Sequence, residues 1–520
     1  MGNKQVTGRK KPGQHGANTP EALQDNLIKQ NQNLGKGYYL TGSLGNGFKS
    51  NLKIAHLKKY TKTEDNTGGV AIKLFDGQSF THSHDFKTEA HILGRCDHPN
   101  IVKLFEITKV DNKLSLVIEL CDGGSILDRL PYKEHQVSKI VRQICSAVSY
   151  MHGKNIAHRD IECSNIMYST KSEDSEVKLV DFGSACELEM APNRPGAYKL
   201  LKGKTGSLSV MAPEVLQCKY GPKADVWSIG VVAYTLLNNG EAPFQGATNK
   251  ELEAKILKGT IDYSTWEHSQ EAKAFCQNTC KGNETQRLSA AATLYDPWLA
   301  SPEKNAFKLL PVELVTSFNF YRSALPLKRI ALNVLARKVK SSKYREVFED
   351  LNKSHTGLMT MEEFMEGFKN SGNSETELFE IYQKLDINNN KGITYTEFIA
   401  ATLEGGGELE EVQLREAFDL ISSNRRYITQ KDVESIVSES LKDRDTAEKV
   451  KNMAENQMRR FTKKHKEEKI HYEDFAQMFE HGFQDLHSSM EIIAEMSLDA
   501  QQFAKLNETD KAAHLSAIGE

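Results

Sequence analysis

The sequence predicts an α+β protein in which a strand-rich lobe and a helix-rich lobe are followed by an all-α region. Three patterns carry this prediction. In residues 38–72 short apolar runs alternate with glycine-rich turns, which is typical of strands. Beyond Ser125 apolar residues recur at helical spacing, as they do from Val137 to Val148. Within residues 344–483 a helix–loop–helix unit recurs four times, which indicates a helical repeat domain.

The composition is that of an ordinary globular protein of roughly three to four domains, since a domain takes about 150 residues and the chain has 520. Hydrophobic residues make up 39% and charged residues 26%, which excludes a largely disordered chain. The net charge of −3 gives no argument for nucleic acid as a partner. No apolar run reaches the ~18 residues of a membrane span, and the eight cysteines form no C-x-x-C pair. We therefore expect a cytoplasmic protein with reduced cysteines.

Five segments with phosphate-handling residue types occur in one order within residues 38–299. They are Gly45-Asn46-Gly47 with Ser50, Val70-Ala71-Ile72-Lys73, Glu89, His158-Arg159-Asp160 with Asn165, and Asp181-Phe182-Gly183 followed by Ala212-Pro213-Glu214. Each segment alone also has a structural reading, because glycine pairs are common in turns and a lysine can lie at a strand edge. Their joint occurrence in this order favours one shared chemical task.

Transfer of a γ-phosphoryl group explains why these residue types stand together, since it needs positioning and charge neutralisation more than covalent chemistry. Backbone N–H groups of a glycine turn can approach phosphates closely, because glycine has no Cβ. Lys73, held by Glu89, can grip the α- and β-phosphates. Asn165 and Asp181 can hold Mg²⁺, and Asp160 can orient the substrate hydroxyl and accept its proton.

The segments resemble the signature set of the protein kinases, and the resemblance covers residues 38–299. It implies a bilobal fold, ATP and Mg²⁺ as cofactors, and a protein hydroxyl as the acceptor. It also implies that Arg287 pairs with Glu214 and that Asp225 braces the catalytic loop. It assigns six residues to the nucleotide: Leu44, Gly45, Gly47, Lys73, Glu119 and Cys121. Glu119 and Cys121 would bind through backbone atoms of the hinge.

The catalytic loop departs from the family's usual H-R-D-L-K-P-E-N, since His158 to Asn165 read H-R-D-I-E-C-S-N. The family's lysine contacts the transferring phosphate, and here Glu162 places a negative charge that opposes transition-state stabilisation. Ser50 also replaces the third glycine of the loop, and Lys49 replaces its usual aromatic residue. An alternative therefore stays open, in which the domain is a weak or inactive pseudokinase that serves as a Ca²⁺-responsive or constitutive scaffold.

The second of the four repeats matches the EF-hand loop best, which supplies oxygen ligands at positions 1, 3, 5, 7, 9 and 12. The matching residues are Asp386, Asn388, Asn390, the carbonyl of Gly392, Thr394 and Glu397. Lys391 stands at the turn position, where glycine is usual, and needs a positive φ. The sequence therefore predicts a Ca²⁺ site in residues 386–397, with a bundle that packs without metal as the alternative.

The other three loops match the EF-hand pattern less well. The first, residues 352–363, keeps Gly357 but offers only Asn, Ser and Thr at positions 1, 3 and 5. The third, residues 422–432, is one residue short and contains two arginines, and the fourth, residues 463–474, opens with two lysines. We expect no Ca²⁺ at the third and fourth loops, and the first loop stays open.

A basic amphipathic helix is predicted between the two regions. From Arg322 to Arg345 there are eight basic residues and no acidic one. A kinase, a basic helix and four EF-hand repeats together resemble the calcium-dependent protein kinases of plants and protists, over residues 38–483. In that family the helix blocks the substrate cleft at rest and is withdrawn when the Ca²⁺-loaded hands grip it, and Leu325–Val339 matches this role. A solvated basic helix is the alternative.

The sequence thus predicts a Ser/Thr protein kinase with ATP, Mg²⁺ and Ca²⁺ as cofactors, regulated in cis by its EF-hand domain. Its expected partners are protein substrates and its own junction helix. Gly2 follows Met1 as in many myristoylated proteins, but Val6 breaks the usual pattern, so weak association with a membrane stays an option beside a cytoplasmic or scaffold-bound location. The expected organisation is a flexible extension at 1–36, a kinase domain at 38–299, an autoinhibitory junction helix at 300–343, a calmodulin-like domain at 344–483 and a helical tail at 484–520.

Overall fold

The computed structural model describes residues 38–46, 50–57, 69–75, 84–110, 113–191, 198–264, 266–299, 311–324, 326–337, 344–354, 356–387, 390–403, 411–422, 426–433 and 469–479. The predictions for residues 1–36, Gly2 and residues 484–520 lie outside this part of the chain. Two compact units contain the described residues, one within 1–94 and 104–118 and the other within 95–103 and 119–520.

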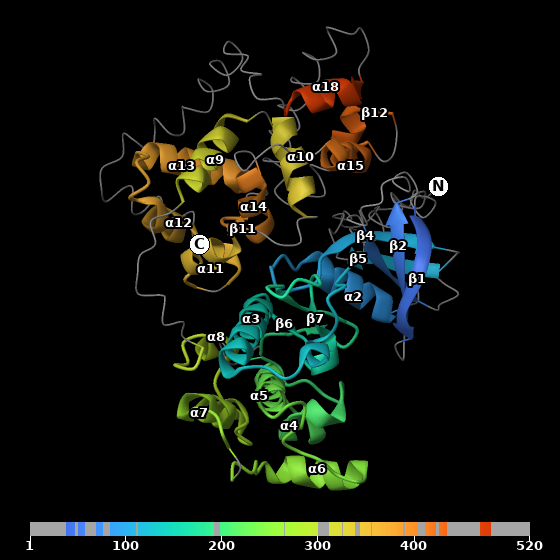
Figure 1. Cartoon of the computed structure of the whole chain (residues 1–520), viewed down its shortest axis with the longest axis vertical. Coiled ribbons are helices and arrows are strands. Elements are labelled where there is room, and N and C mark those ends of the chain that lie inside the picture. Colours follow the sequence, from blue (N-terminus) through green and yellow to red (C-terminus); the bar gives the residue numbers. More distant parts are fainter. Residues whose placement is uncertain are drawn as a thin grey trace, which may run out of the picture. The chain divides into compact units, whose positions relative to one another are not determined.

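The described residues of the first unit form five strands and one helix: β1 (Tyr38–Asn46), β2 (Ser50–Leu57), β3 (Val70–Phe75), β4 (Leu104–Val110), β5 (Lys113–Glu119) and α2 (His84–Gly94). The strands form one sheet in the order β1-β2-β3-β5-β4 (Figure 1). All six residues of β3 are buried, five apolar residues and Lys73. The apolar residues just before β4 do not belong to this sheet, since Ile101 pairs with Leu179.

The second unit begins with a helical lobe: α3 (Glu134–Gly153), α4 (Pro213–Leu216), α5 (Lys223–Leu237), α6 (Asn249–Lys258), α7 (Gln270–Thr279) and α8 (Ala290–Thr293). Helix α5 is apolar on almost every side and contacts both α3 and α7 (Figure 1). Short pairs of strands connect these helices: β6 (Ile156–Ala157) with β9 (Cys186–Glu187), and β7 (Ile166–Tyr168) with β8 (Val177–Leu179). The described residues of the lobe also include the 3₁₀ turns η3 (Ile126–Arg129), η4 (Cys163–Asn165), η5 (Leu208–Val210) and η6 (Glu284–Gln286).

Helix–loop–helix units follow in the same unit. The first two contain α11 (Arg345–Leu351), β10 (Leu358–Met359), α12 (Met361–Phe368), α13 (Glu375–Leu385), β11 (Ile393–Thr394) and α14 (Tyr395–Leu403). The described parts of the next two are α15 (Glu411–Ile421), β12 (Tyr427–Ile428), β13 (Ile470–His471) and α18 (Tyr472–Gln477). Antiparallel bridges join β10 to β11 and β12 to β13, so the repeats are coupled in pairs through their loops.

The predicted junction contains two helices, α9 (Val312–Ser323) and α10 (Pro326–Ala336), where the sequence predicted one. Pro326 explains the break, because proline lacks the N–H of a helix interior and fits the first helical position. Helix α10 contacts both α14 and α15 (Figure 1). Its apolar face is shared between two cores, since Leu332 lies in the core of the first pair of repeats and Ile330 in that of the second.

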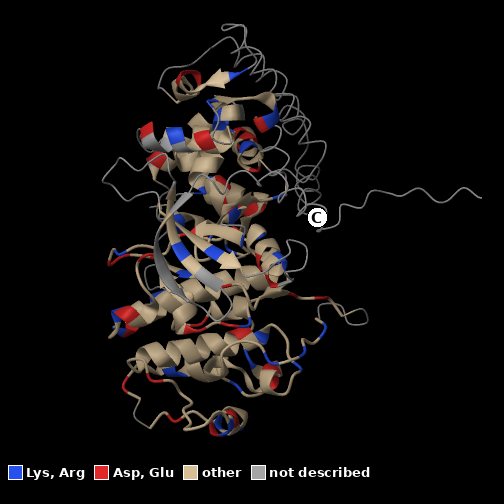
Figure 2. Cartoon of the chain, turned by 90° about the vertical axis from the view of Figure 1, so that its right-hand side faces the viewer, with Lys and Arg blue, Asp and Glu red and all other residues tan. Residues whose placement is uncertain are grey.

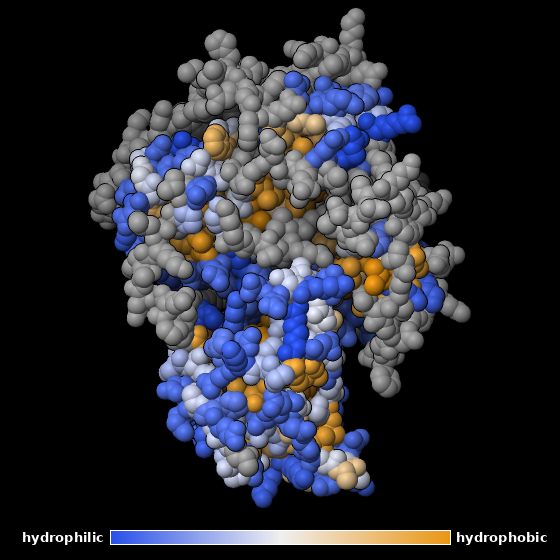
Figure 3. Space-filling model, viewed as in Figure 1, coloured by the Kyte–Doolittle hydropathy of each residue, from blue (hydrophilic) through white to orange (hydrophobic). Residues whose placement is uncertain are grey.

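The surface agrees with the composition. Figure 2 shows acidic and basic residues interspersed along the described elements, and Figure 3 shows a mainly hydrophilic face over the helical lobe with small hydrophobic patches. All eight cysteines are free thiols. In the part of the chain that the structure describes, no helix has the length and apolar character that crossing a membrane requires.

Candidate active site and calcium-binding loops

The predicted phosphate-gripping lysine lies in the first unit. Lys73 is placed by the buried strand β3 and Glu89 by helix α2, and both side chains are almost completely buried. The Lys73 Nζ donates to both carboxylate oxygens of Glu89, at 2.7 and 2.9 Å. A buried ammonium needs such a charged partner, and the two-oxygen contact fixes the position of the Lys73 ammonium. The sequence predicted this pair 16 residues apart.

The predicted glycine turn is described only at its edges. Leu44 and Gly45 belong to β1, and Gly45 is opposite Leu52 of β2 beside an irregularity in the strand register. Gly47 lies outside the described residues, and Ser50 starts β2. The two antiparallel strands that flank the motif are therefore present.

The hinge residues belong to the second unit. The Glu119 N–H donates to the Lys103 carbonyl at 2.9 Å. The buried carboxylate of Glu119 forms an ion pair with Lys178 at 3.0 Å, and Cys121 is also buried. Burial, followed by the charge of Lys178, lowers the pKa of Lys103 to about 8.

The catalytic loop holds Asp160 and Asn165 in fixed positions. The N–H of Ser207 donates to Asp160 Oδ1 at 2.9 Å, and the Asn165 amide nitrogen donates to the Asp160 carbonyl at 3.0 Å. Gly206 makes the first contact possible, because a Cβ there would lie 2.2 Å from the Arg159 carbonyl oxygen and the φ of Gly206 is 93°. The arrangement holds one carboxylate oxygen of Asp160 beside the backbone of Ser207.

A buried carboxylate braces this loop, as the sequence predicted. Asp225 accepts hydrogen bonds from the N–H groups of His158 and Arg159, at 3.0 and 2.8 Å, and contacts His152 Nε2 at 2.9 Å. Burial favours the neutral acid, but the contacts of His152 and the Arg159 N–H hold the pKa of Asp225 below its ordinary value. Arg159 has a φ of 67°, so the brace also holds a left-handed backbone conformation that costs energy in a non-glycine residue.

The predicted metal-holding residues flank the β7–β8 pair. Asp181 follows β8 with a φ of 59° and accepts from the Gly183 N–H at 3.2 Å. Asp181 is exposed, whereas the next residue, Phe182, is buried against the ring of His158. The amide nitrogen of Asn165 is used by Asp160, so the amide oxygen is the atom that can serve a cation. A carboxylate and an amide oxygen are the donor set that fits Mg²⁺.

Glu162, the main departure from the family pattern, is half-buried. Its Oε1 accepts from the Ser164 hydroxyl at 2.6 Å, and its carbonyl accepts from the Asn165 N–H at 3.0 Å. The side chain is therefore held by a neighbour that is itself a departure, because the family has a glutamate where Ser164 stands.

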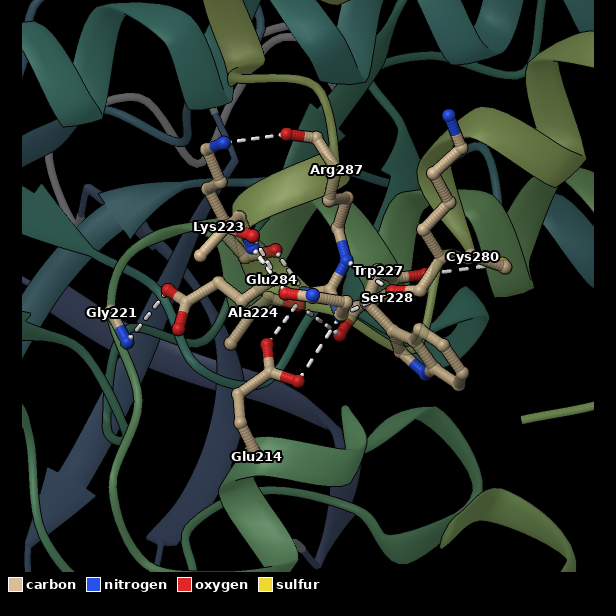
Figure 4. A network of polar contacts seen from close by, with 12 residues as sticks. Glu214, Gly221, Lys223, Ala224, Trp227, Ser228, Cys280, Glu284 and Arg287 are labelled. Atoms are coloured by element: carbon tan, nitrogen blue, oxygen red, sulfur yellow. Dashed lines mark hydrogen bonds and ion pairs between the residues drawn. The ribbon is translucent and has the colours of Figure 1, made fainter. Parts of the chain in front are cut away.

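The predicted link between Arg287 and Glu214 is confirmed (Figure 4). The guanidinium donates to both carboxylate oxygens of Glu214, at 2.5 and 3.1 Å, and to the carbonyls of Lys281 and Lys223. The side chain of Arg287 is fully buried. This network ties α4, α5 and the segment before α8 to one another.

The second EF-hand loop keeps two carboxylates. Asp386 and Glu397, at positions 1 and 12, are buried, and Glu397 caps helix α14 together with Thr394. Asp386 accepts from the N–H groups of Asn390 and Lys391, at 3.0 and 3.1 Å. Lys391 has the positive φ that the sequence required, 68°. The remaining predicted ligands are Gly392, which is buried, and Asn388, which lies outside the described residues.

The loops of the second pair are described only in part, and the expectation that they bind no Ca²⁺ stays a prediction. Asp432, at the end of the third loop, accepts from the N–H and hydroxyl of Thr429, at 2.7 and 2.6 Å. Asp474 of the fourth loop lies in the first turn of α18, and residues 463–468 are not described. Among the described residues no three His, Cys, Asp or Glu side chains are grouped to hold a metal, so a Ca²⁺ site must also use amide, hydroxyl and carbonyl oxygens.

Two contacts that fix the site were missed by sequence reasoning. The Ser207 N–H gives no side-chain signal, although the glycine before it hints at a close backbone approach. Lys178 does leave a signal, since it stands between two apolar residues in β8 and a buried lysine needs an acidic partner. Its partner could not be read from the sequence, because Glu119 lies in a distant strand.

Known proteins are similar in sequence to both halves of the chain. The sequence model of the protein kinase domain matches residues 39–299, and that of the EF-hand domain pair matches residues 341–403. Calcium-dependent protein kinase 5 of Plasmodium berghei (strain Anka) is 31% identical over 428 residues, which are 79% of this chain and 74% of the relative. Calcium-dependent protein kinase 9 of Arabidopsis thaliana is 29% identical over 442 residues, which are 81% of this chain and 79% of the relative.

These matches confirm the predicted resemblance and the predicted fold class. A protein kinase domain implies ATP, Mg²⁺ and protein substrates, and an EF-hand pair implies Ca²⁺. Because the kinase domain and the repeats also occur in the predicted order, the chain belongs to the family of calcium-dependent protein kinases.

Proposed function

We propose that this chain transfers the γ-phosphoryl group of ATP to a Ser or Thr hydroxyl, with Asp160 as the residue that orients the hydroxyl. The observation that carries the proposal is the doubly fixed catalytic loop, in which Asp225 holds the backbone of Arg159 and Ser207 holds the Asp160 carboxylate. A carboxylate held in this way can accept a proton without first reorganising.

Two residues of the second unit complete the chemistry in this proposal. Asn165 and Asp181 would hold Mg²⁺, whose charge neutralises the phosphate oxygens as charge develops on them. The positive φ of Asp181 supports the assignment, because strained backbone persists where surrounding structure fixes it.

In the first unit, Lys73 would grip the α- and β-phosphates and Glu89 would position it. Their two-oxygen ion pair supports these roles. The backbone of Gly45 and Gly47, and that of Glu119 and Cys121 in the hinge, would bind the nucleotide. Leu44 is the remaining residue that the family resemblance assigns to the nucleotide.

Regulation in this proposal acts through helix α10. We propose that its basic, amphipathic sequence occupies the substrate cleft at rest, and that the EF-hand repeats hold it in the active state. The burial of Leu332 and Ile330 in the two EF-hand cores supports the second half of this cycle. Ca²⁺ would enter at residues 386–397, where Asp386 and Glu397 supply its two carboxylates.

A scaffold without phosphotransfer is the second candidate, and Glu162 favours it. An anion near the transferring phosphate raises the barrier, and the hydrogen bond to Ser164 holds that anion in the catalytic loop. The residues for ATP and Mg²⁺ are all retained, so a scaffold of this kind would still bind the nucleotide. Myristoylation of Gly2 and a cytoplasmic or scaffold-bound location remain predictions from the sequence.

A phosphotransfer assay separates the two candidates. Wild type is compared with Asp160→Asn, with a generic basic protein substrate, Mg²⁺-ATP, and either Ca²⁺ or a chelator. The proposal expects Ca²⁺-stimulated transfer that Asp160→Asn abolishes. Transfer that is undetectable in wild type, with intact nucleotide binding, would establish the scaffold.

A further inference from the structure

The first EF-hand loop, residues 352–363, is closed by an asparagine amide. The Oδ1 of Asn352 accepts from the Gly357 N–H at 2.9 Å. Its Nδ2 donates to the Leu358 carbonyl at 2.9 Å and to Glu363 Oε2 at 3.3 Å. Turning the amide over would set two donors against each other at Gly357, so the nitrogen must face Glu363. A nitrogen that carries protons cannot bind a cation.

The carboxylate at the end of this loop is occupied by donors of the protein itself. Glu363 Oε1 accepts from the Ser354 N–H at 2.6 Å, and Oε2 accepts from the Thr360 N–H at 2.9 Å as well as from Asn352. Three N–H groups therefore surround the group that would chelate Ca²⁺ from position 12. The donor set of this loop does not fit Ca²⁺.

The second loop differs at the equivalent position. Asp386 accepts two backbone N–H groups, as Asn352 accepts one, but both of its side-chain atoms are oxygens with further lone pairs. The two loops share Thr at position 9 and Glu at position 12. At the carboxylate positions, 1 and 12, the loops therefore differ by one amide in place of a carboxylate oxygen, and they differ further at positions 3 and 5, where the first loop has hydroxyls and the second has amides.

The closed loop packs on helix α3 of the kinase domain. Gly357 has a φ of 70°, and a Cβ on it would lie 2.2 Å from Cδ2 of Tyr150. Tyr150 is buried, and its hydroxyl accepts from the Asp97 N–H at 2.8 Å, so the ring cannot retreat easily. The position-6 glycine therefore has a second role, because it allows the loop to touch the kinase.

A buried arginine strengthens the same contact. Arg345, at the start of α11, donates to Asn100 Oδ1 at 3.1 Å and forms ion pairs with Glu176 at 3.2 Å and Glu349 at 2.7 Å. Only 6% of its side chain is exposed. A buried guanidinium with two carboxylate partners makes a specific contact, since removing one partner leaves an uncompensated charge.

Two further contacts join the EF-hand region and helix α10 to the segment of residues 95–103. Thr396, in the first turn of α14, donates to Asp97 through its N–H at 3.2 Å and its hydroxyl at 2.7 Å. Lys103 Nζ donates to the Ala336 carbonyl at the C-terminal end of α10, at 3.2 Å. A cation is favourable there, because the last carbonyls of a helix carry partial negative charge.

We propose that the first EF-hand is a Ca²⁺-independent docking module, which its Asn352–Glu363 hydrogen bond keeps closed and which Gly357 and Arg345 hold on the helical lobe of the kinase. The inference goes beyond the proposed function. Its partner is this chain's own segment around Tyr150, Asn100 and Glu176, and the attachment would persist when the second loop releases its ion.

The first experiment exchanges the two loop-opening residues in the full chain. Asn352→Asp gives the first loop the carboxylate set of the second, and Asp386→Asn is the reverse change. Calorimetric titration with CaCl₂ should show about one site in wild type, one more in Asn352→Asp, and one fewer in Asp386→Asn. Two sites in wild type, or an unchanged number in Asn352→Asp, would overturn the proposal.

The second experiment measures amide hydrogen exchange of residues 138–153 and 344–354, with chelator and with Ca²⁺. In wild type, protection should be equal in the two conditions. Arg345→Met and Gly357→Ala should each lower it by about tenfold or more in both conditions, since each removes a buried contact. Glu346→Gln, an exposed neighbour on the same helix, is the matched control and should change nothing.

Wild-type protection that appears only with Ca²⁺ would refute Ca²⁺-independent docking, as would variants with wild-type protection. Protection elsewhere in the same spectra shows whether each variant folds. Neither experiment reads phosphotransfer, so failure of the docking proposal and failure of the proposed kinase activity remain distinguishable.

Discussion

Among single residues, the ion pair of Lys73 with Glu89 has the clearest chemical consequence. Lys73→Met removes the cation assigned to the α- and β-phosphates, and we expect phosphotransfer to fall by at least about 100-fold. Lys53→Met on the neighbouring strand β2 is the matched control, because Lys53 is opposite Ile72 and only half-buried. Rates are measured at saturating Mg²⁺-ATP, with circular dichroism to verify folding. A Lys73→Met variant with the wild-type rate would show that the assignment is wrong.

Glu162 allows a gain-of-function prediction. If its charge opposes transfer, Glu162→Lys should raise kcat by about tenfold or more, because a well-placed cation stabilises the transition state. Glu162→Gln removes the charge and preserves an acceptor for Ser164, so an intermediate rise is expected. The measurement is the steady-state rate at saturating substrate. A kcat that stays equal or falls in both variants would show that Glu162 does not limit transfer.

Sequence reasoning at the residue scale succeeded where a residue type has only one good partner in a known motif. Lys73 with Glu89, Arg287 with Glu214, and the positive φ of Lys391 are examples. It failed where a backbone N–H or a distant segment supplies the contact. Ser207 is 47 residues from Asp160, and Arg345 is 245 residues from Asn100, so only the folded chain brings these pairs together.

Among secondary-structure elements, the buried Arg287 network allows a stability prediction. Arg287→Lys keeps the charge but loses the two-pronged geometry, and we expect it to lower the free energy of unfolding of the helical lobe by about 1–3 kcal/mol. All three tryptophans, Trp227, Trp266 and Trp298, lie in this lobe, so tryptophan fluorescence in urea reports on it. Lys281→Met is the matched control, since Lys281 contacts Arg287 through its carbonyl. Equal urea midpoints for the two variants would contradict the prediction.

The EF-hand loops give a prediction on binding stoichiometry. Ca²⁺ should bind at about one site per chain, because of the four loops only residues 386–397 have a carboxylate at position 1 as well as at position 12. Glu397→Gln removes one carboxylate and should abolish this site in a calorimetric titration. Affinity should be weak for a sensor, because the ligand charge is low and Lys391 adopts a strained φ. Two sites of similar affinity, or binding retained in Glu397→Gln, would contradict this prediction.

The junction shows what element prediction missed. Its basic residues and apolar face predicted a helix, and α10 is that helix, but α9 was not predicted as a separate element. Pro326 was the available signal for a break. The division of the apolar face between two cores could not be predicted, because it depends on which repeats meet the helix.

For the whole molecule, the order of motifs along the chain was sufficient to predict the family and fold class, since each motif has a fixed place in a kinase or an EF-hand. The docking of the first EF-hand on the helical lobe was outside the reach of the sequence. In the sequence, Arg345 is one more residue of a basic segment, although in the folded chain it contacts two carboxylates. Long-range pairing of this kind leaves no local pattern.

The most direct test of Ca²⁺-regulated phosphotransfer is the initial rate of phosphate transfer from labelled ATP as a function of free Ca²⁺. Wild type is compared with Glu397→Gln and with Asp474→Asn, an acid-to-amide change at the same position of a loop expected to bind no ion. The wild-type and Asp474→Asn rates should rise together with Ca²⁺, whereas the Glu397→Gln rate should stay at the value measured with chelator. A Glu397→Gln rate that rises as in wild type, or a wild-type rate that does not respond to Ca²⁺, would contradict the account.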